Sequence, residues 1–176
     1  MFMRHEQRNG PSIDVLQAFD AHHALLFRFA YRLTGSVADA EDLVQACFLE
    51  LLRSDCSYNP ARAPLRTWLF GVIRNQSLKR LRQKGAPHLP TTADVPSPER
   101  EILRVEIEEV VLRAVLTLPE TQREVLILAH YEHMPLAEIA GILDIELGAV
   151  KSRLQRARAT LRERLAAYAP NVERGR

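Results

Sequence analysis

The chain has 176 residues, 47% of them hydrophobic, which suffices for one medium or two small folded domains. A net charge of +2 excludes a uniformly basic polycation, and no apolar run approaches the ~20 residues of a membrane span. The N-terminal MFMRHEQRNG lacks the apolar core of a signal peptide, and Cys47 and Cys56 do not suggest a disulfide framework. We therefore expect a cytoplasmic protein without membrane insertion.

Helical periodicity predicts three helices in the first half of the chain. The first carries an apolar stripe from Phe19 to Leu33 and is ended by Gly35. The second runs over about 37–53, and the third begins near Pro64, a residue suited to a first helical turn. No stretch alternates in a β manner, so the whole chain is predicted to be all-α.

The second and third predicted helices differ in charge. The second carries carboxylates at several outward positions and has no cation before Arg53, whereas residues 66–84 contain several cations and not one carboxylate. Two distinct partners would explain this polarity better than a single one. Trp68 has a side chain suited to base stacking, but its position between Leu65 and Leu69 favours the core.

A proline-rich segment, KGAPHLPTTADVPSP, breaks the helical pattern over residues 84–98 and predicts an extended linker. It divides the chain into two small helical domains, 11–84 and 98–169, joined by residues 85–97. The second domain reads as four helices. Its short third helix, PLAEIAGILD, and the turn residues IEL precede a longer basic helix, which is the pattern of a helix-turn-helix.

The stretch GAVKSRLQRARATLRERL, residues 148–165, is the candidate recognition helix. An apolar stripe is predicted at Val150, Leu154, Ala157, Leu161, Leu165 and Tyr168. The opposite pole holds Lys151, Ser152, Gln155 and Arg156, which can reach base edges, and flanking arginines suit phosphate contacts. A solvated basic helix end is the alternative, and the helix-turn-helix context favours DNA binding over it.

Three motifs together resemble bacterial extracytoplasmic-function (ECF) sigma factors. Residues 118–165 resemble region 4, DAEDLVQACFLELL at 39–52 resembles region 2.2, and RTWLFGVIRNQSLKRLR at 66–82 resembles regions 2.3 to 2.4. They occur in the family's order, with a proline-rich linker between them. The resemblance implies a sigma-2 and a sigma-4 domain, binding to core RNA polymerase and promoter DNA, and an anti-sigma factor as a further partner.

The resemblance also assigns site residues. Asp39, Asp42, Gln45 and Phe48 would dock on the polymerase clamp, although Phe48 could equally belong to the core. The minus-ten element would be bound by Tyr58, Asn59, Arg62, Arg74, Asn75, Lys79 and Arg80. The minus-thirty-five element would be read by Lys151, Ser152, Gln155 and Arg156, the residues that the helical wheel places at the outward pole.

The sequence departs from the family pattern at four positions. Ala46 stands where glutamate is common, which removes one acidic contact to the polymerase. Asp144 replaces a turn glycine and tolerates positive φ at modest cost. Glu146 and Ala149 replace the usual Ser and Thr, so the start of the recognition helix is expected to be poorly capped.

The sequence disfavours three other functions. A decoy that only sequesters an anti-sigma factor would not need basic runs in both halves, and a one-domain regulator would not need the charge split of the first half. An enzyme is disfavoured because HYEH, residues 130–133, has metal-ligand spacing of three rather than four and no evident third ligand. We therefore expect no catalytic activity, no cofactor and no metal, and we interpret Cys47 and Cys56 as inert rather than as a thiol switch.

Overall fold

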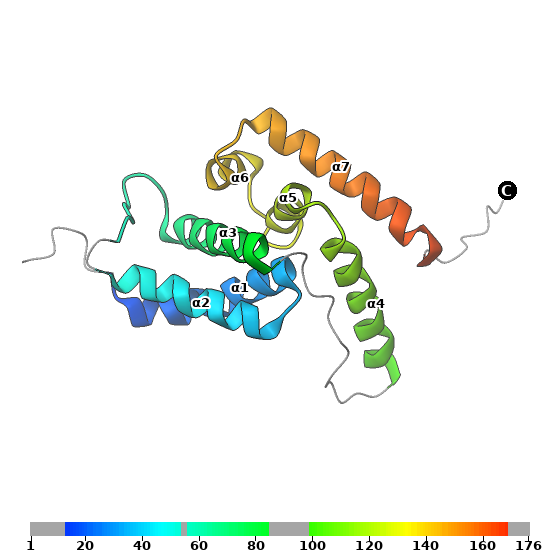
Figure 1. Cartoon of the computed structure of the whole chain (residues 1–176), viewed down its shortest axis with the longest axis horizontal. Coiled ribbons are helices and arrows are strands. Elements are labelled where there is room, and N and C mark those ends of the chain that lie inside the picture. Colours follow the sequence, from blue (N-terminus) through cyan, green and yellow to red (C-terminus); the bar gives the residue numbers. More distant parts are fainter. Residues whose placement is uncertain (1–12, 54–55, 85–98, 169–176) are drawn as a thin grey trace, which may run out of the picture.

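The computed structural model describes residues 13–53, 56–84 and 99–168; the predicted linker at 85–97 lies outside this range. The described residues form seven α-helices and no strand, which confirms the all-α prediction (Figure 1). The first three helices are α1 (Val15–Thr34), α2 (Val37–Leu52) and α3 (Leu65–Lys84). The others are α4 (Glu99–Leu116), α5 (Glu120–His130), α6 (Leu136–Leu143) and α7 (Leu147–Leu165), with a short 3-10 helix at Ala166–Tyr168.

Local signals in the sequence explain how α1 and α2 begin and end. The Asp14 carboxylate accepts hydrogen bonds from the backbone amides of Leu16 and Gln17, which caps the start of α1. Gly35 adopts a left-handed conformation at φ 73° and ends α1, as predicted. The Ser36 hydroxyl then accepts from the Asp39 amide and caps α2. Two consecutive caps therefore produce the tight corner between these helices.

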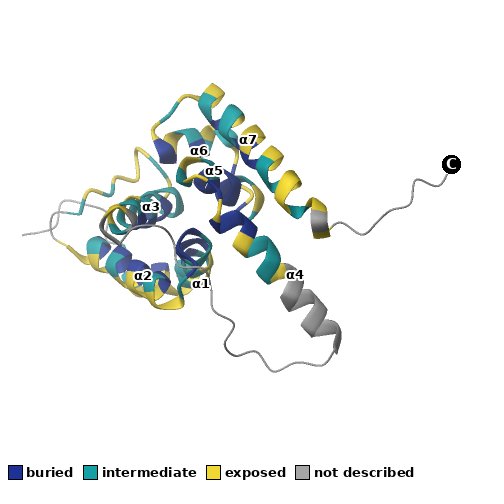
Figure 2. Cartoon of the chain, turned by 45° about the vertical axis from the view of Figure 1, so that its right-hand side comes forward, coloured by how far each residue is buried: buried dark blue, intermediate teal, exposed yellow. Residues whose placement is uncertain are grey.

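The N-terminal core lies between α1, α2 and α3. Phe29 of α1 and Phe70 of α3 are both fully buried and meet edge to face, with ring centroids 4.8 Å apart. Leu69 and Ile73 are buried, whereas Trp68, for which the sequence favours the core, is only half-buried. Figure 2 shows that the buried residues of these three helices face one another.

The C-terminal core forms where α5, α6 and α7 pack together. Val150, Leu154 and Ala157 of α7 are buried as predicted, while Tyr168 at the end of the predicted stripe is 66% exposed. The Tyr168 prediction was wrong because α7 ends at Leu165 and a 3-10 turn follows, which changes the angular spacing of the side chains.

The turn between α6 and α7 agrees with the expectation for a helix-turn-helix. Asp144 adopts the left-handed conformation at φ 52°, and the Ile145 amide donates to the Ala140 carbonyl at 3.1 Å. Glu146 precedes α7, but its side chain caps none of the backbone amides there. The poor capping expected from the sequence is confirmed.

The two halves of the molecule contact each other directly. Helix α1 packs against α5 and against α4, and α3 packs against α6 (Figure 1). The contact brings the helix-turn-helix of the C-terminal half onto the basic helix of the N-terminal half. The sequence does not predict this contact, because the helices that make it lie far apart in the chain.

Candidate nucleic-acid interface

The outward face of α7 presents the polar pole that the sequence predicts. Lys151, Gln155 and Arg156 are exposed, and Ser152 is half-buried. The Ser152 hydroxyl donates to the Ala149 carbonyl at 3.1 Å, which still leaves its oxygen able to accept a hydrogen bond. Three long side chains and one hydroxyl on successive turns of an exposed helix can read base edges in a major groove.

The flanking cations of α7 are not equivalent. Arg162 and Arg164 are exposed, as a phosphate-contacting role requires. Arg158 instead donates its Nε hydrogen to Nε2 of His130 at 3.0 Å, and burial together with this arginine lowers the pKa of His130. Arg153 is half-buried and lies near enough to the Glu124 carboxylate to favour its charged form. The sequence could not separate these roles, since both partners come from α5.

The basic helix α3 is exposed at Asn75, Lys79 and Arg82. Two of the cations predicted to bind the minus-ten element instead make intramolecular ion pairs. Arg74, with 19% of its side chain exposed, lies 3.2 Å from Oε2 of Glu124, and Arg80 contacts carboxylates of α2. Both arginines are therefore engaged within the chain, while part of each side chain remains exposed.

The loop before α3 is held by local contacts. Asn59 accepts a hydrogen bond from the Ala61 amide through its side-chain oxygen at 2.9 Å, which forms an Asx turn. The rings of Tyr58 and Trp68 pack edge to face, with their centroids 5.6 Å apart, and this contact holds the loop against the first turn of α3. Arg62 is exposed at the end of this loop. These contacts join the loop residues predicted for the minus-ten element to the start of the basic helix.

The acidic helix α2 exposes Asp42 and Gln45, while Asp39 is half-buried. Phe48 lies in the core at 6% exposure, and its ring is 5.0 Å from that of Phe19. Of the two roles that the sequence left open for Phe48, the burial favours the core.

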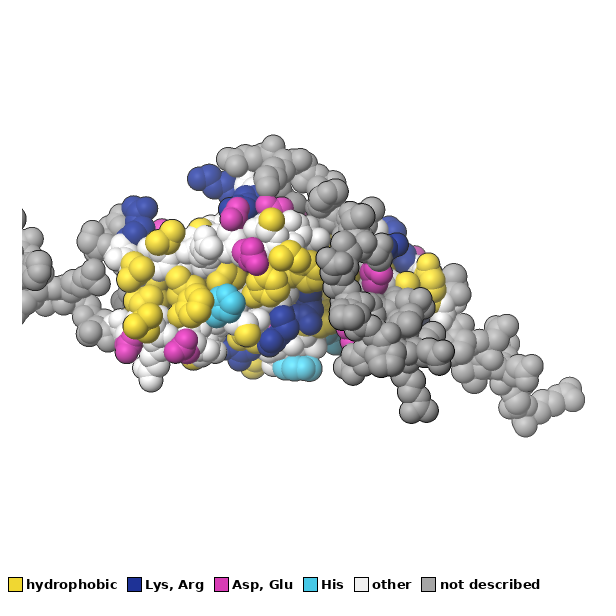
Figure 3. All heavy atoms as spheres, turned by 90° about the horizontal axis from the view of Figure 1, so that it is seen from below, with side chains coloured by type: hydrophobic (Ala, Val, Ile, Leu, Met, Phe, Trp, Pro, Cys, Tyr) yellow, Lys and Arg dark blue, Asp and Glu magenta, His cyan; other side chains and the backbone are white. Residues whose placement is uncertain are grey.

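Exposed leucines lie beside the acidic residues, and sequence reasoning missed them. Leu49 is 63% exposed and Leu52 is 48% exposed on α2, and Leu16 and Phe19 are exposed on α1. Figure 3 shows hydrophobic side chains gathered on this side of the molecule, next to acidic and histidine side chains. The run FLELL in the sequence could have indicated them, because its apolar residues are spread around the helix and cannot all lie on the buried face.

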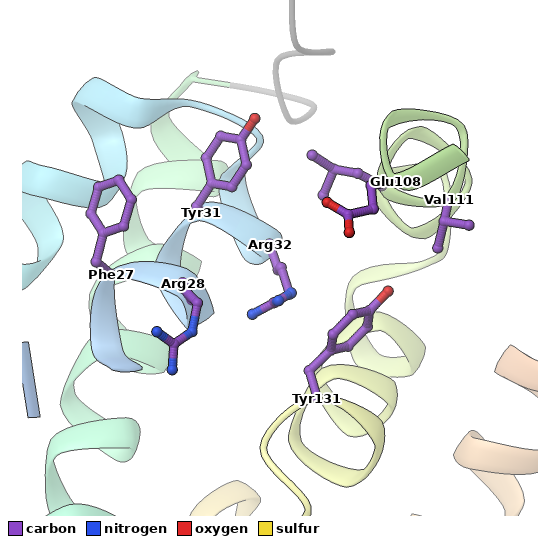
Figure 4. Close-up of a pocket in the computed structure, with 8 residues that line it drawn as sticks. Phe27, Arg28, Tyr31, Arg32, Glu108, Val111 and Tyr131 are labelled. Atoms are coloured by element: carbon purple, nitrogen blue, oxygen red, sulfur yellow. The ribbon is translucent and has the colours of Figure 1, made fainter. Parts of the chain in front are cut away.

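A groove of about 340 Å³ lies between α1 on one side and α4 with the end of α5 on the other (Figure 4). Phe27, Arg28 and Tyr31 line it from α1, and Val111 and Tyr131 from the opposite side. Arg32 reaches across it, with its guanidinium 4.2 Å from the Tyr131 ring centroid. The groove is therefore a consequence of the contact between the halves.

Several charged residues are buried beside this contact. Burial raises the pKa of Glu124 and of Glu132, against the opposing effect of Arg74 on the first and of Arg32 on the second. Burial likewise lowers the pKa of Arg123, which is 3% exposed. Ionisable side chains placed in such an environment need specific partners.

Among the described residues, no group of three or more histidine, cysteine, aspartate or glutamate side chains could hold a metal ion. In HYEH, Glu132 is buried and faces Arg32 at 3.6 Å, while His133 is exposed. None of the helices in the described ranges combines the length and the apolarity that crossing a membrane requires. Cys47 and Cys56 are both reduced thiols.

Comparison with known protein families gives two matches, one to each half of the chain. Sigma-70 region 2 matches residues 18–86, and Sigma-70 region 4 matches residues 108–161. The chain is 28% identical to the ECF RNA polymerase sigma factor SigW of Bacillus subtilis over 161 residues, covering 83% of this chain and 86% of that protein. It is 33% identical to the ECF sigma factor SigL of Mycobacterium tuberculosis, covering 82% and 84% of the two chains.

Among solved structures, the chain is similar to the sigma factor RpoE from Bartonella quintana, crystallised in complex with the anti-sigma factor NepR. The TM-score is 0.71 and the sequence identity is 26%, with 87% of this chain and 97% of that chain covered. Both halves of the present chain are therefore included in the match.

Proposed function

Because this chain belongs to the ECF RNA polymerase sigma factors, we propose that its two helical domains divide promoter recognition between them. The chain acts in promoter recognition and transcription initiation. Sigma factors are non-enzymatic initiation factors, and we propose that this chain likewise has no catalytic activity and works in the cytoplasm. The proposed domains are residues 11–84 and 98–169, with 85–97 as the connection.

The first part of the proposal is that α2 docks on core polymerase. Asp39, Asp42 and Gln45 supply an acidic, hydrogen-bonding surface that suits a basic partner. The exposed Leu49 and Leu52 add an apolar contact of the kind that dominates protein interfaces. Phe48 supports this surface from beneath through its contact with Phe19.

The second part concerns the minus-ten element. The separated DNA strand would run along the loop before α3 and along α3 itself, with cations contacting phosphates and polar groups contacting bases. The residues proposed for this surface are Tyr58, Asn59, Arg62, Arg74, Asn75, Lys79 and Arg80. The contact between Tyr58 and Trp68 supports this assignment, because it joins the loop to the helix in a single surface.

The third part concerns the minus-thirty-five element, and it rests on the observation that carries the whole proposal. Lys151, Gln155 and Arg156 are exposed on the outward face of a helix that follows a helix-turn-helix turn with Asp144 in the left-handed conformation. We propose that these residues and Ser152 read the duplex in its major groove.

We further propose an anti-sigma factor as a regulatory partner. The similar RpoE structure was solved in complex with such a protein, NepR. A partner could bind in the groove between α1, α4 and α5, which has both aromatic and charged lining, or on the exposed leucines of α2.

Run-off transcription with core polymerase on a library of bacterial genomic fragments tests the proposal. We expect transcripts from a small set of promoters only when this chain is added, and weak duplex binding by the chain alone, because two modest surfaces need the polymerase to act together. Absence of transcripts together with failure to co-purify with core polymerase would overturn it.

A further inference from the structure

Lysine is rare in this chain, and its positions are informative. Only three of the 24 lysine and arginine residues are lysines, namely Lys79, Lys84 and Lys151. Lys79 lies on α3 in the surface proposed for the minus-ten element, and Lys84 is the last residue of that helix. Lys151 lies at the outward pole of α7. The chain therefore carries its lysine amines on the two helices proposed to bind DNA and nowhere else.

The cations that pair with carboxylates of other elements are arginines. Arg32, Arg74 and Arg80 make these ion pairs, at distances of 3.6, 3.2 and 3.2 Å. Lys79 and Lys151, in contrast, are exposed, and neither makes an ion pair with any residue in the described ranges. A chemical change at either lysine therefore leaves these contacts of the fold intact.

Lysine and arginine also differ in reactivity. A lysine amine that has lost its proton is a nucleophile, whereas the guanidinium of arginine stays protonated and does not react in this way. Acetylation of a lysine removes its positive charge and with it the attraction to a phosphate. A reagent that selects amines would act on the two DNA-binding helices and spare the arginines that stabilise the fold.

We propose that Lys79 and Lys151 are acylation sites, and that their modification switches off promoter binding while the chain stays folded and able to dock on core polymerase. The inference rests on the proposed function, which makes α3 and α7 DNA-binding surfaces. The acyl donor is an acyl phosphate or an acyl thioester.

The reaction is a simple acyl transfer. The unprotonated amine nitrogen attacks the acyl carbon, and a C–N bond forms. The bond from that carbon to the phosphate oxygen, or to the thiol sulfur, breaks, and phosphate or thiolate leaves. The proton lost from the nitrogen passes to water, and nothing is oxidised or reduced. The product is a neutral amide at the end of each lysine side chain.

The surface proposed to dock on polymerase contains no lysine. Helix α2 has the sequence VADAEDLVQACFLELL, so an amine-selective reagent leaves its carboxylates and its exposed leucines unchanged. An acylated chain would therefore occupy core polymerase without opening a promoter. Loss of DNA binding can then be measured separately from loss of docking.

Treatment with acetyl phosphate tests the proposal. The full-length chain, with Lys84→Arg so that two lysines remain, is treated alone and freed of reagent before core polymerase is added. A parallel sample receives acetyl coenzyme A, which shows which donor is used. Peptide mass spectrometry locates the acetyl groups, and circular dichroism checks the fold. We expect acetylation of Lys79 and Lys151, unchanged co-purification with core polymerase, and run-off transcription lowered roughly tenfold or more.

The matched control replaces Lys79 and Lys151 by arginine, which keeps both charges and does not accept an acetyl group. Its transcription after treatment is compared with that of its own untreated sample, and it should not fall. Replacing the same two lysines by glutamine gives neutral side chains without any treatment. This variant should reproduce the loss of transcription and still co-purify with core polymerase.

Chains with a single lysine separate the two surfaces. With Lys79→Arg, only Lys151 reacts, and acetylation should reduce discrimination among minus-thirty-five variants. With Lys151→Arg, only Lys79 reacts, and acetylation should weaken binding to every promoter. It should also flatten the salt dependence of binding by about 0.7, the slope for one phosphate contact on a single strand.

Three outcomes would overturn the acylation sites and leave the proposed function standing. They are acetylation of neither lysine by either donor, complete acetylation with unchanged transcription, and an equal loss of transcription in the arginine control. An untreated chain that gives no transcripts with core polymerase would instead overturn the proposed function, and the promoter-binding role of both lysines with it.

Discussion

The Arg80 guanidinium on α3 lies 3.2 Å from the Asp42 carboxylate on α2, and the same nitrogen lies 3.2 Å from Asp39. A cation proposed to follow DNA is thus paired with carboxylates proposed to face the polymerase. The sequence suggested two surfaces for two separate partners, but in the chain alone they partly neutralise each other. On the proposed assignments, binding of either partner competes with the ion pairs of Arg80.

Asp42→Arg should therefore weaken core binding on the order of tenfold or more and abolish transcription, with the fold intact. The Asp42 side chain is 62% exposed, so the change is tolerated structurally, but it turns attraction at the polymerase into repulsion. Co-purification with core polymerase measures the loss, and circular dichroism checks the fold. Glu41→Arg, an equal charge change at an exposed neighbour, is the control. Equal co-purification of the Asp42 variant and wild type would contradict the docking assignment.

The two cysteines should differ sharply in reactivity. Burial, with smaller effects from Glu50 and Cys56, raises the pKa of Cys47 to about 12, and its thiol lies 3.7 Å from the Leu69 carbonyl. At pH 8 we expect Ellman's reagent to modify Cys56 and to leave Cys47 unmodified in the folded chain. The Cys56→Ser variant should then show no rapid reaction. Rapid modification of two thiols in the wild-type chain would show that Cys47 is reachable.

Local features of the fold could be predicted from the sequence because local residues determine them. Gly35 ends α1, Asp144 takes the left-handed turn conformation, and Glu146 fails to cap α7, all as the residue types indicate. The pole of α7 also followed from helical periodicity alone. Tyr168 was misplaced because periodicity assumes that the α-helix continues beyond Leu165.

The contact between the halves could not be predicted, since it depends on residues far apart in the chain. Arg123 donates to Leu33 across ninety positions, and neither residue carries a local signal of that pairing. The same contact gives Arg74, which the sequence assigns to the minus-ten element, an ion-pair partner within the chain. The sequence therefore predicts which residues lie together on the exposed face of a helix, but it does not predict which of them pair with residues of other helices.

The stability of the chain should carry the pH signature of a buried carboxyl at Glu124. Burial raises the pKa of Glu124 above 4.5, and it outweighs the nearby Arg74, which lowers the pKa. Two smaller effects act in opposite directions: the charge of Glu120 raises the pKa, and that of Arg153 lowers it. The folded chain then binds this proton more tightly than the unfolded chain does. The resulting stabilisation is complete below about pH 4.5 and is lost as the pH rises through the folded-state pKa.

Glu124→Gln stays neutral at every pH and lacks this dependence. The free energy of unfolding of wild type relative to Glu124→Gln should therefore be greatest at acidic pH and should fall as the pH rises above 4.5. Urea unfolding of both proteins from pH 4.5 to pH 8 measures it. If the stability of wild type relative to Glu124→Gln instead grew with pH, the ion pair with Arg74 would outweigh the cost of burying the Glu124 carboxylate.

Leu154→Ala should destabilise the C-terminal half by roughly 2–5 kcal/mol, because the side chain is 6% exposed and packs in its core. Thermal unfolding followed by circular dichroism measures the loss. Gln155→Ala, one position along on the exposed face, should leave the melting temperature nearly unchanged. Equal melting temperatures for the two variants would contradict the packing of α7.

The pole and the flanks of α7 should respond differently to substitution if the helix reads DNA. Arg156→Ala and Gln155→Ala each remove an exposed group aimed at base edges, so each should cost about 1–3 kcal/mol at particular minus-thirty-five positions. Arg162→Ala should weaken binding evenly across sequences and flatten its salt dependence, as loss of a phosphate contact does.

Arg158 adds a distinction that only the structure supplies. Because its guanidinium is held by His130, Arg158→Ala should affect DNA binding less than Arg162→Ala does. Titration of each mutant holoenzyme on a set of promoter variants, at two salt concentrations, separates these effects. If pole and flank variants lose affinity equally for every promoter, α7 grips phosphates without reading bases, and its exposed pole has no part in specificity.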